Sequence, residues 1–352
     1  MKNINRHKMT AIDRFYPSGI LVLKKPHGES SRATLNRLQY AVKFHHKRQL
    51  ELLQQEVTCQ TSLDSAEMLR VLQQRKTPRV GHAGTLDPLA NGVLIACVGE
   101  ATKLVEAIQT LPKQYTAEFR LGAISDTEDI EGNIREIVAP PQPTFHELQQ
   151  AAAKFVGKIL QRPPIFSALK VGGQRSYNLA RQGIEPELQP RKITIYKIGI
   201  LEYQYPLFRL SIECGSGTYI RSLGRDIGES VGNGAIMTAL TRERIGEFRL
   251  ENAVPPTIFD DPNKEKWLEY LLPTETGAAH LPRINLTEHL VQQIRYGQQI
   301  HLKDFVLPDF LSSTNNNNHC EHRLIAAFSP EQKLISLLEL DETFLLRIKK
   351  NF

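Results

Sequence analysis

The chain has few cysteines and no long apolar run. Its four cysteines, Cys59, Cys97, Cys214 and Cys320, are never at C-x-x-C spacing, which argues against a structural zinc site and a disulfide framework. The longest early apolar segment, "GILVL", is far too short to cross a bilayer. No apolar signal-peptide core follows the basic start "MKNINRHKMT", so we expect a cytoplasmic protein without a membrane anchor.

The sequence also lacks the motifs of several common enzyme classes. No glycine-rich segment continues into G-K-[ST], and "GSGTYIR" lacks the later glycine of a dinucleotide fingerprint, which argues against ATP or NAD. H-E-x-x-H, paired carboxylates and G-x-S-x-G are absent. The segment "HCEH" (319–322) follows four asparagines and is more typical of a solvated loop than of a metal site. The sequence therefore gives no sign of an ATP, NAD or metal site.

What is present indicates an ordinary globular protein. The 352 residues are 41% hydrophobic and 23% charged, enough for one large domain and a smaller one. The net charge of +6 is compatible with a polyanionic partner, of which nucleic acid is the obvious class. Charge alone does not establish such a partner.

Strand and helix patterns alternate along the chain and predict an α+β fold. Strands are indicated by the segments "GILVLKKP", which ends at Pro26, "YTAEFRL" (115–121), "ITIYKIGI" and "LFRLSIEC". Helices are expected after a Ser31 cap with Leu35, Leu38 and Val42 on one face, after the capping box of Thr144 and Glu147, and around Ile220, Leu223 and Ile227. The segments "RLIAAF" and "KLISLLEL" indicate a small β-rich unit near the end.

The segment "RVGHAGTLDPLANGVLIACVGEATKL" (79–104) carries a single carboxylate in a glycine-rich turn. Glycines at 81, 84 and 92 permit a positive φ or a close backbone approach, and Pro88 pushes Asp87 toward extended geometry. A stiffened turn suits a group that must reach one atom. Asp-Pro is also a common turn dipeptide, so the loop alone leaves a structural role open. An aspartate that works alone, as nucleophile or base, is the catalytic interpretation.

This segment closely resembles the catalytic motif of the TruB family, the bacterial tRNA pseudouridine-55 synthases. Further blocks resemble the family in the same order along the chain: "GILVLKKPHGESS", "KQYTAEFRLG", "RPPIFSALKVGGQRSYNLARQGIE", "CGSGTYIRSLGRDIG" and "LPRINLTEHLVQQIRYGQQI". The resemblance implies isomerisation of the T-loop uridine of tRNA to pseudouridine, with no cofactor, no metal and no guide RNA, by a monomer. It implies a pseudouridine-synthase fold, in which helices flank a mixed, largely antiparallel central sheet.

The resemblance also implies roles for particular residues. Asp87 matches the essential aspartate, Arg221 the arginine that pairs with it, and Tyr115 the tyrosine that stacks on the target base and assists proton removal. Five more residues match or lie within motifs and are expected to bind substrate: Lys25, His82, Lys103, Tyr219 and Leu240, the last as an apolar wall. Without the resemblance, each has an ordinary alternative, such as surface charge for Arg221, core packing for Tyr115 and loop hydrogen bonding for His82.

The chemistry is consistent with this set. Pseudouridylation breaks the N1–C1′ bond of uridine, turns the base and joins C5 to C1′, so one carboxylate suffices. It either attacks C1′ or takes a proton from the sugar to give a glycal, and both routes stay open. The target base must first leave its stack, which costs a few kcal/mol. A stacking aromatic side chain recovers about 1–3 kcal/mol per base.

The resemblance divides the chain into a catalytic domain (1–272) and a small β-rich, PUA-like RNA-binding domain (273–352). An RNA-gripping insertion is expected at about 157–191. The stretch 42–77 is longer than the usual family connection; contact with tRNA, contact with a partner and plain exposure to solvent all stay open, and exposure is the interpretation that we favour. Two departures from the family pattern are Ala83 and Lys24. Loss of catalysis with retained RNA binding, and a guide-dependent enzyme resembling dyskerin, are the competing hypotheses.

Overall fold

The structure, a computed structural model, describes residues 16–58, 69–70, 73–74, 76–167, 169–184, 186–261, 264–298, 300–301, 323–340 and 345–352. The segment "HCEH" and residues 59–68 of the long insertion lie outside the described residues. Among the described helices, none is both long and apolar enough to span a membrane.

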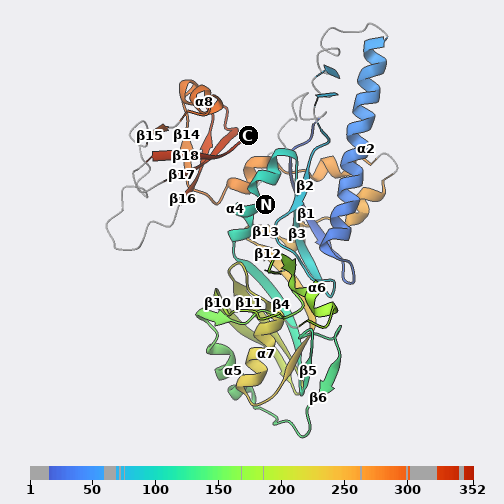
Figure 1. Cartoon of the computed structure of the whole chain (residues 1–352), viewed down its shortest axis with the longest axis vertical. Helices are drawn as coiled ribbons and strands as arrows, with labels where there is room; N and C mark the ends of the chain where they lie inside the picture. The colour runs from blue at the N-terminus through green and yellow to red at the C-terminus, as the bar shows by residue number, and fades with distance from the viewer. Residues whose placement is uncertain are drawn as a thin grey trace.

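A nine-stranded sheet forms the centre of the molecule (Figure 1). Its main path runs β1-β3-β12-β4-β11-β10-β7, with β2 paired to β3 and β13 to β12. Only the β3–β12 pair in this sheet is parallel; its other pairs are antiparallel. The strands span Gly19–Lys25 (β1), Val80–His82 (β2), Ala90–Val98 (β3), Lys113–Leu121 (β4), Gly157–Gln161 (β7), Arg191–Gln204 (β10), Leu207–Cys214 (β11), Ala235–Ile245 (β12) and Phe248–Arg249 (β13). This is the mixed, largely antiparallel sheet that was predicted.

Two short strand pairs lie outside the central sheet. They are β5–β6 (Ala123–Ser125 and Ile134–Glu136) and β8–β9 (Lys170–Val171 and Gln174–Arg175). The second pair and the short helix α6 (Ser176–Arg181) fall within the expected RNA-gripping insertion.

Helices flank the central sheet. The α-helices of this part are α2 (Ser31–Thr58), α4 (Val105–Thr110), α5 (Phe145–Ala153) and α7 (Ile220–Ser230), and 3-10 turns include η1 (Gly99–Leu104), η2 (Leu250–Asn252), η3 (Pro256–Asp260), η4 (Lys266–Tyr270) and η5 (Thr274–Ala278). Three of the helices, α2, α5 and α7, lie where capping residues and hydrophobic periodicity predicted helices. The capping box of Thr144 and Glu147 is confirmed at the start of α5. Ile220, Leu223 and Ile227 of α7 are buried against Phe119 and Leu148, which places α7 on the sheet.

The start of α2 differs by one residue from the prediction. Ser30, and not Ser31, caps the helix, because the Ser30 hydroxyl accepts a hydrogen bond from the backbone N–H of Ala33. Ser31 is the first helical residue, and its buried side chain turns toward the loop that precedes β3. Leu35, Leu38 and Val42 are buried as expected. The helix then continues to Thr58 as one element.

A second, five-stranded sheet confirms the strand-rich region near the end of the chain. Its order is β14-β16-β17-β18-β15, and its strands span Arg283–Asn285, Ile300–His301, Arg323–Phe328, Leu334–Leu340 and Leu345–Asn351, in sequence order β14 to β18, with the helix α8 (Glu288–Arg295) beside them. One side of this sheet packs against the part of the molecule that contains the central sheet, where Phe328 and Leu337 share a core with Ile20 of β1 and Ile95 of β3. The preceding turn η5 belongs to that shared core through Ala278.

Candidate active site

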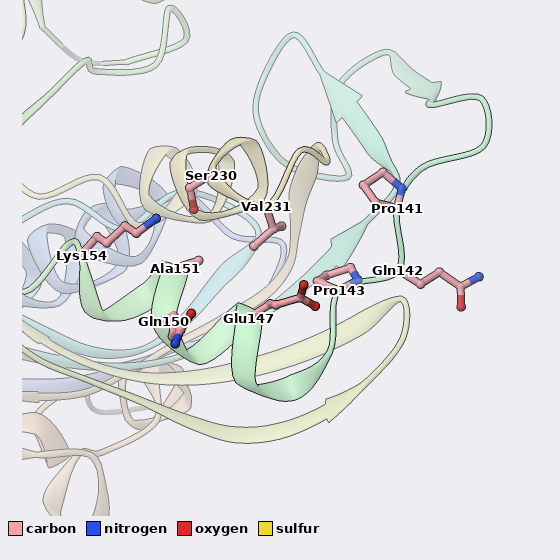
Figure 2. A pocket seen from close by; sticks show the side chains of 9 residues that line it. All are labelled: Pro141, Gln142, Pro143, Glu147, Gln150, Ala151, Lys154, Ser230 and Val231. Atoms are coloured by element: carbon pink, nitrogen blue, oxygen red, sulfur yellow. The ribbon is translucent and has the colours of Figure 1, made fainter.

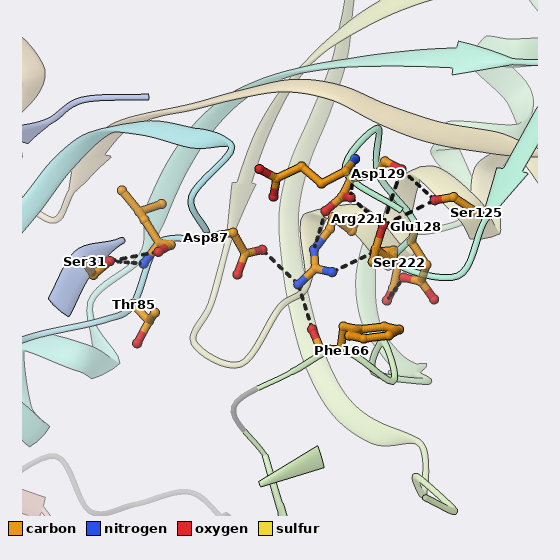
Figure 3. A network of polar contacts seen from close by, with 12 residues as sticks. Ser31, Thr85, Asp87, Ser125, Glu128, Asp129, Phe166, Arg221 and Ser222 are labelled. Carbon is orange, nitrogen blue, oxygen red and sulfur yellow. Dashed lines mark hydrogen bonds and ion pairs between the residues drawn. The ribbon is translucent and has the colours of Figure 1, made fainter. Parts of the chain in front are cut away.

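The loop that carries Asp87 is held from several directions. Ser31 Oγ accepts a hydrogen bond from Leu86 N and donates one to Leu86 O, both at 2.8 Å (Figure 3). The N–H of Gly28 donates to the carbonyl of Pro88 at 2.8 Å. Because the Ser31 side chain and the Gly28 backbone fix the loop, Asp87 is presented on a stiff support. The stiffened turn that the sequence predicts is therefore present.

Glycine is required where this loop joins the sheet. Gly92, the third residue of β3, has φ +110°, and a Cβ there would lie 2.3 Å from the carbonyl oxygen of Arg242 on the parallel strand β12. Any larger residue would push β3 and β12 apart. Gly84 also has a positive φ, +104°. Both glycines therefore adopt the positive φ that the sequence pattern suggested, and Gly92 also allows the close backbone approach.

Asp87 and Arg221 form an ion pair across 134 positions of sequence. Arg221 Nη2 lies 2.9 Å from Asp87 Oδ2 (Figure 3), while the side chains are 6% and 39% exposed, respectively. The guanidinium is thus buried behind a carboxylate that stays open to solvent. A ligand can reach Asp87 without displacing Arg221 from the protein interior.

Arg221 is itself held by further partners. Its Nη1 donates to the carbonyl of Thr127 at 2.7 Å and its Nη2 to that of Phe166 at 3.1 Å. Its Nε lies 3.6 Å from Oδ2 of Asp129, a carboxylate only 4% exposed. Phe166 belongs to the expected RNA-gripping insertion, so that insertion touches the charged centre. The fork of a guanidinium makes these simultaneous contacts possible, as a lysine ammonium would not.

Neighbouring carboxylates form a network around the start of α7. Glu128 accepts a hydrogen bond from Ser222 Oγ at 2.6 Å and pairs with Arg225. Burial raises the pKa of Glu128, and the Arg225 charge opposes that rise. Asp129 accepts from the Thr127 hydroxyl at 2.5 Å and from the Glu131 N–H at 3.0 Å. The network fixes the segment 127–131 against α7, and with it the rear of Arg221.

Tyr115 and Leu240 line the sheet side of the site. Tyr115 lies on β4 opposite Arg242 of β12, and Leu240 pairs with Ala117 of β4 and Ala90 of β3. Both side chains are buried in one apolar cluster. Burial raises the pKa of the Tyr115 hydroxyl, and the nearby Asp87 charge adds to the rise. The structure therefore brings Tyr115, Leu240 and Asp87 to the same region.

Arg242 is a second buried guanidinium that sequence reasoning missed. Its Nε donates to Val93 O at 2.7 Å and its Nη2 to Gly84 O at 3.0 Å, and it hydrogen-bonds the Tyr115 side chain. Arg242 therefore connects the loop that carries Asp87 to Tyr115 of β4. The segment "TRERIGEF" places three charged residues, Arg242, Glu243 and Arg244, in a row, so nothing in it marks one arginine as buried. Arg242 could have been singled out only by its position opposite Tyr115 in the β12–β4 pair, and that pairing is known only from the assembled sheet.

Lys25 is placed differently from the expectation of a substrate contact. Its side chain is 0% exposed, and Nζ donates to the carbonyls of Pro88 at 3.2 Å and Ala90 at 2.5 Å. Burial lowers the pKa of Lys25 to about 8. The ammonium holds the residues just after Asp87, which is a positioning contact; the expected contact between Lys25 and the substrate stays a prediction.

Tyr219 lies near the Asp87–Arg221 pair, and His82 lies near Arg242 and Gly84 of the loop that carries Asp87. Burial lowers the pKa of His82, and the guanidinium charges of Arg242 and Arg32 add to this effect. Tyr219 precedes α7 at its N-cap, where its backbone exchanges two hydrogen bonds with the side chain of Gln161. Burial raises the pKa of Tyr219, and the Asp87 charge contributes. Both candidates therefore belong to the Asp87 region.

Lys103 lies apart from this group. Its ammonium contacts the carboxylate of Glu100 and the carbonyl of Asn351, and lies 5.4 Å from the ring centroid of Phe352. These contacts join η1 to the last strand of the second sheet. Lys103 thus connects η1 to the second sheet, a structural contact that the motif alone did not indicate.

A pocket of about 380 Å³ opens between α5 and the end of α7 (Figure 2). Pro141, Glu147, Lys154 and Ser230 are among its lining residues, and none of the predicted site residues lines it. The described His, Cys, Asp and Glu side chains form no group of three that would hold a metal ion.

Comparison with solved structures identifies the class of fold. A Cbf5–Nop10–Gar1 complex matches 96% of this chain and 85% of that chain with a TM-score of 0.62 at 21% identity. An H/ACA RNP bound to a substrate RNA matches 97% and 87%, with a TM-score of 0.60 at 20% identity. The chain therefore has the predicted pseudouridine-synthase fold.

Comparison of sequences identifies the family. The family described as "TruB family pseudouridylate synthase (N terminal domain)" matches residues 70–220. A tRNA pseudouridine synthase B of Dehalococcoides mccartyi is 40% identical over 272 residues, covering 77% of this chain and 89% of that protein. One of Clostridium tetani is 38% identical over 255 residues, covering 72% and 86%. The chain belongs to the TruB family of pseudouridylate synthases.

Proposed function

We propose that this enzyme converts the T-loop uridine of tRNA, position 55, to pseudouridine, acting as a monomer without a guide RNA. The relatives named tRNA pseudouridine synthase B support tRNA as the substrate. The observation that carries the proposal is the open Asp87 carboxylate with the buried Arg221 guanidinium 2.9 Å behind it. A protein that only binds RNA has no need of this pair.

The reaction is an isomerisation in which no atom is gained or lost. The N1–C1′ bond breaks, the base turns, and C5 bonds to C1′; the proton lost from C5 is balanced by the proton that N1 gains. Asp87 acts at the sugar, by attack at C1′ or by proton removal, and both routes use one carboxylate. Arg221 keeps that carboxylate oriented, since its own position is fixed by Thr127 and Asp129.

Tyr115 and Leu240 are proposed to form the wall that receives the flipped base. Both side chains are largely buried in one apolar cluster, so the base is proposed to pack against the small part of each that stays exposed. Stacking on an aromatic ring returns about 1–3 kcal/mol toward the cost of extrusion. Burial raises the pKa of the Tyr115 hydroxyl, which is therefore protonated at neutral pH. We propose that this hydroxyl donates or relays a proton and does not act as a free phenolate. His82 and Tyr219 are proposed to contact the RNA around that nucleotide.

The domain roles follow from the same hypothesis. We propose that residues 1–272 perform the catalysis and that 273–352 form the PUA-like RNA-binding unit. The five-stranded sheet beginning at Arg283 supports the second part. The insertion 157–191 is proposed to grip the RNA, which is supported by the contact between the Phe166 carbonyl and Arg221.

The test is to incubate the purified chain with an unmodified tRNA transcript and to map pseudouridine at single-nucleotide resolution. Product is expected at the T-loop uridine with no RNA other than the substrate, and a T-arm hairpin is expected to be a substrate as well. A transcript with cytidine at that position is the control. Absence of product with the wild-type chain would refute the proposal in favour of an RNA-binding protein, and a requirement for added guide RNA would favour the guide-dependent class.

A further inference from the structure

The long helix α2 begins at the catalytic loop and leads away from it. Ser31, its first residue, bonds Leu86, the neighbour of Asp87. At 1.5 Å per residue, the 28 residues of α2 extend about 42 Å from that point. Figure 1 shows the helix running along one side of the molecule, well past the upper end of the central sheet. A group placed along α2 therefore lies at an increasing distance from the reacting nucleotide.

One side of α2 is buried against the protein and the opposite side faces solvent. Leu35, Leu38 and Val42 pack in a core with Phe259 and Trp267. Helical periodicity turns another set of residues outward. We call this set the outer face of α2; all its members are exposed, and they are Arg32, Arg37, Tyr40, Lys43, Phe44 and Lys47.

The outer face carries positive charge that the protein leaves largely uncompensated. Residues 31–50 contain five Lys and Arg and no Asp or Glu, whereas the net charge of the whole chain is only +6. Lys47, with a side chain 77% exposed, lies 3.7 Å from Glu51, and Arg48 lies 3.7 Å from Glu265. Among the described residues, no carboxylate forms an ion pair with Arg37 or Lys43. Such a row of cations favours a polyanion.

Aromatic side chains interleave with these cations. Tyr40 is 61% exposed and Phe44 is 37% exposed, four residues apart on the same face. Exposed aromatic rings between cations are typical of surfaces on which nucleic-acid bases stack while lysine and arginine contact phosphates. The combination fits RNA better than it fits an acidic protein segment.

The outer face is also continuous with the active site. Arg32 directly follows Ser31, whose side chain exchanges hydrogen bonds with Leu86, so the first cation of the outer face lies beside the Asp87 loop. From Arg32 the cations continue outward along the helix. An RNA whose target nucleotide sits at Asp87 thus meets the first cation at the site and the others beyond it.

We propose that the outer face of α2 binds the phosphates of the substrate tRNA outside the target nucleotide and enlarges the surface that this enzyme presents to its substrate. This inference rests on the proposed function, because it takes tRNA as the substrate. It assigns the start of the long insertion, where Lys43, Phe44 and Lys47 lie, to RNA contact, whereas the sequence alone favoured simple exposure. Arg37, Lys43 and Lys47 make the phosphate contacts and the two aromatic rings assist.

The test compares two sets of alanine substitutions in the full-length chain. The first combines Arg37→Ala, Lys43→Ala and Lys47→Ala, since alanine preserves helix formation. A control for loss of charge combines Arg135→Ala and Lys154→Ala, two exposed cations on β6 and at the C-cap of α5, at the far end of the central sheet. The dissociation constant for unmodified tRNA is measured over a series of salt concentrations, and circular dichroism checks that helix content is retained.

For the α2 variant, affinity for tRNA is expected to fall at least tenfold, and the slope of log K against log salt to become shallower by about 2. The single-turnover rate at saturating tRNA should stay within twofold of wild type, because the substitutions avoid the Asp87 site. The control variant should keep both its affinity and its slope.

Unchanged affinity and slope in the α2 variant would overturn the inference, and so would an equal loss in the control, which would show only an effect of total charge. These outcomes are separate from the proposed function, which is tested by product formation with the wild-type chain. If the wild type binds tRNA through α2 yet forms no pseudouridine, the proposed function fails and the inference about binding stands.

Discussion

Arg221 lies between two carboxylates of different exposure. Its Nη2 is 2.9 Å from Asp87 Oδ2 and its Nε is 3.6 Å from Asp129 Oδ2, and Asp129 is buried whereas Asp87 is open. Buried charge is tolerated here because each partner has an opposite charge or a backbone group at hand. The arrangement leaves one carboxylate oriented and accessible, and the other as a fixed support.

Replacing Arg221 with lysine keeps the charge but removes the fork. A lysine ammonium is unable to hold Asp87, the Thr127 carbonyl and Asp129 from one planar group. We expect the single-turnover rate of Arg221→Lys to fall about 100-fold, equivalent to about 2.7 kcal/mol, with tRNA affinity within threefold. Rapid-quench kinetics at saturating tRNA measures this. A rate close to wild type would show that charge alone suffices.

Asp129→Asn tests the buried support. It removes the rear negative charge that helps to fix Arg221, so we expect about a tenfold loss of turnover and a loss of about 1–3 kcal/mol in the free energy of unfolding. Asp226→Asn is the matched control, since Asp226 pairs with Arg225 on the same helix. Kinetics and urea unfolding are compared for the two variants. Equal effects would contradict a particular role for Asp129.

Lys25→Met distinguishes positioning from substrate contact. Its ammonium is buried among carbonyls that follow Asp87, so its loss leaves acceptors unsatisfied at about 1–3 kcal/mol each. We expect a lower melting temperature and reduced turnover but unchanged affinity for tRNA at every salt concentration. A shallower salt slope in Lys25→Met would instead show that Lys25 reaches a phosphate.

Acid should weaken the fold through His82. The pKa of His82 is lowered by burial in the folded protein, so the unfolded chain binds its proton more tightly. The stability due to neutral His82 is therefore present above its unfolded pKa, about 6.5, and is lost as the pH falls toward the lowered folded pKa. Urea unfolding of wild type and His82→Gln from about pH 5 to 8 checks this. The wild type should lose more stability on acidification, and parallel curves would contradict it.

Local sequence patterns predicted the elements that depend mainly on interactions between residues close together in the sequence. Alternation gave β4 around Tyr115, and the Thr144–Glu147 spacing gave the cap of α5. The resemblance led to the expected partnership of Asp87 with Arg221, and the structure contains that ion pair. These features depend on periodicity, on one turn, or on a motif long enough to be recognised.

Tertiary contacts decided what the sequence did not predict. Arg242 and Lys25 look like surface cations in their own segments, and only the β1–β3–β12 packing buries them against carbonyls. Asp129 sits in an acidic loop, and its role depends on α7 arriving from 90 residues further along. Lys103 is close to the motif in sequence, yet it faces the second sheet. Burial of a charge is a property of the assembled sheets and not of the segment.

The most direct measurement compares Asp87→Asn with wild type on the same unmodified tRNA, following pseudouridine formation in a single turnover and binding by filter retention. Asparagine keeps the size of the side chain while removing the charge that pairs with Arg221. We expect no detectable product and a dissociation constant within a few-fold of wild type. Turnover by Asp87→Asn at a rate near that of the wild type would contradict the central claim, and loss of folding and binding together would show that Asp87 is structural.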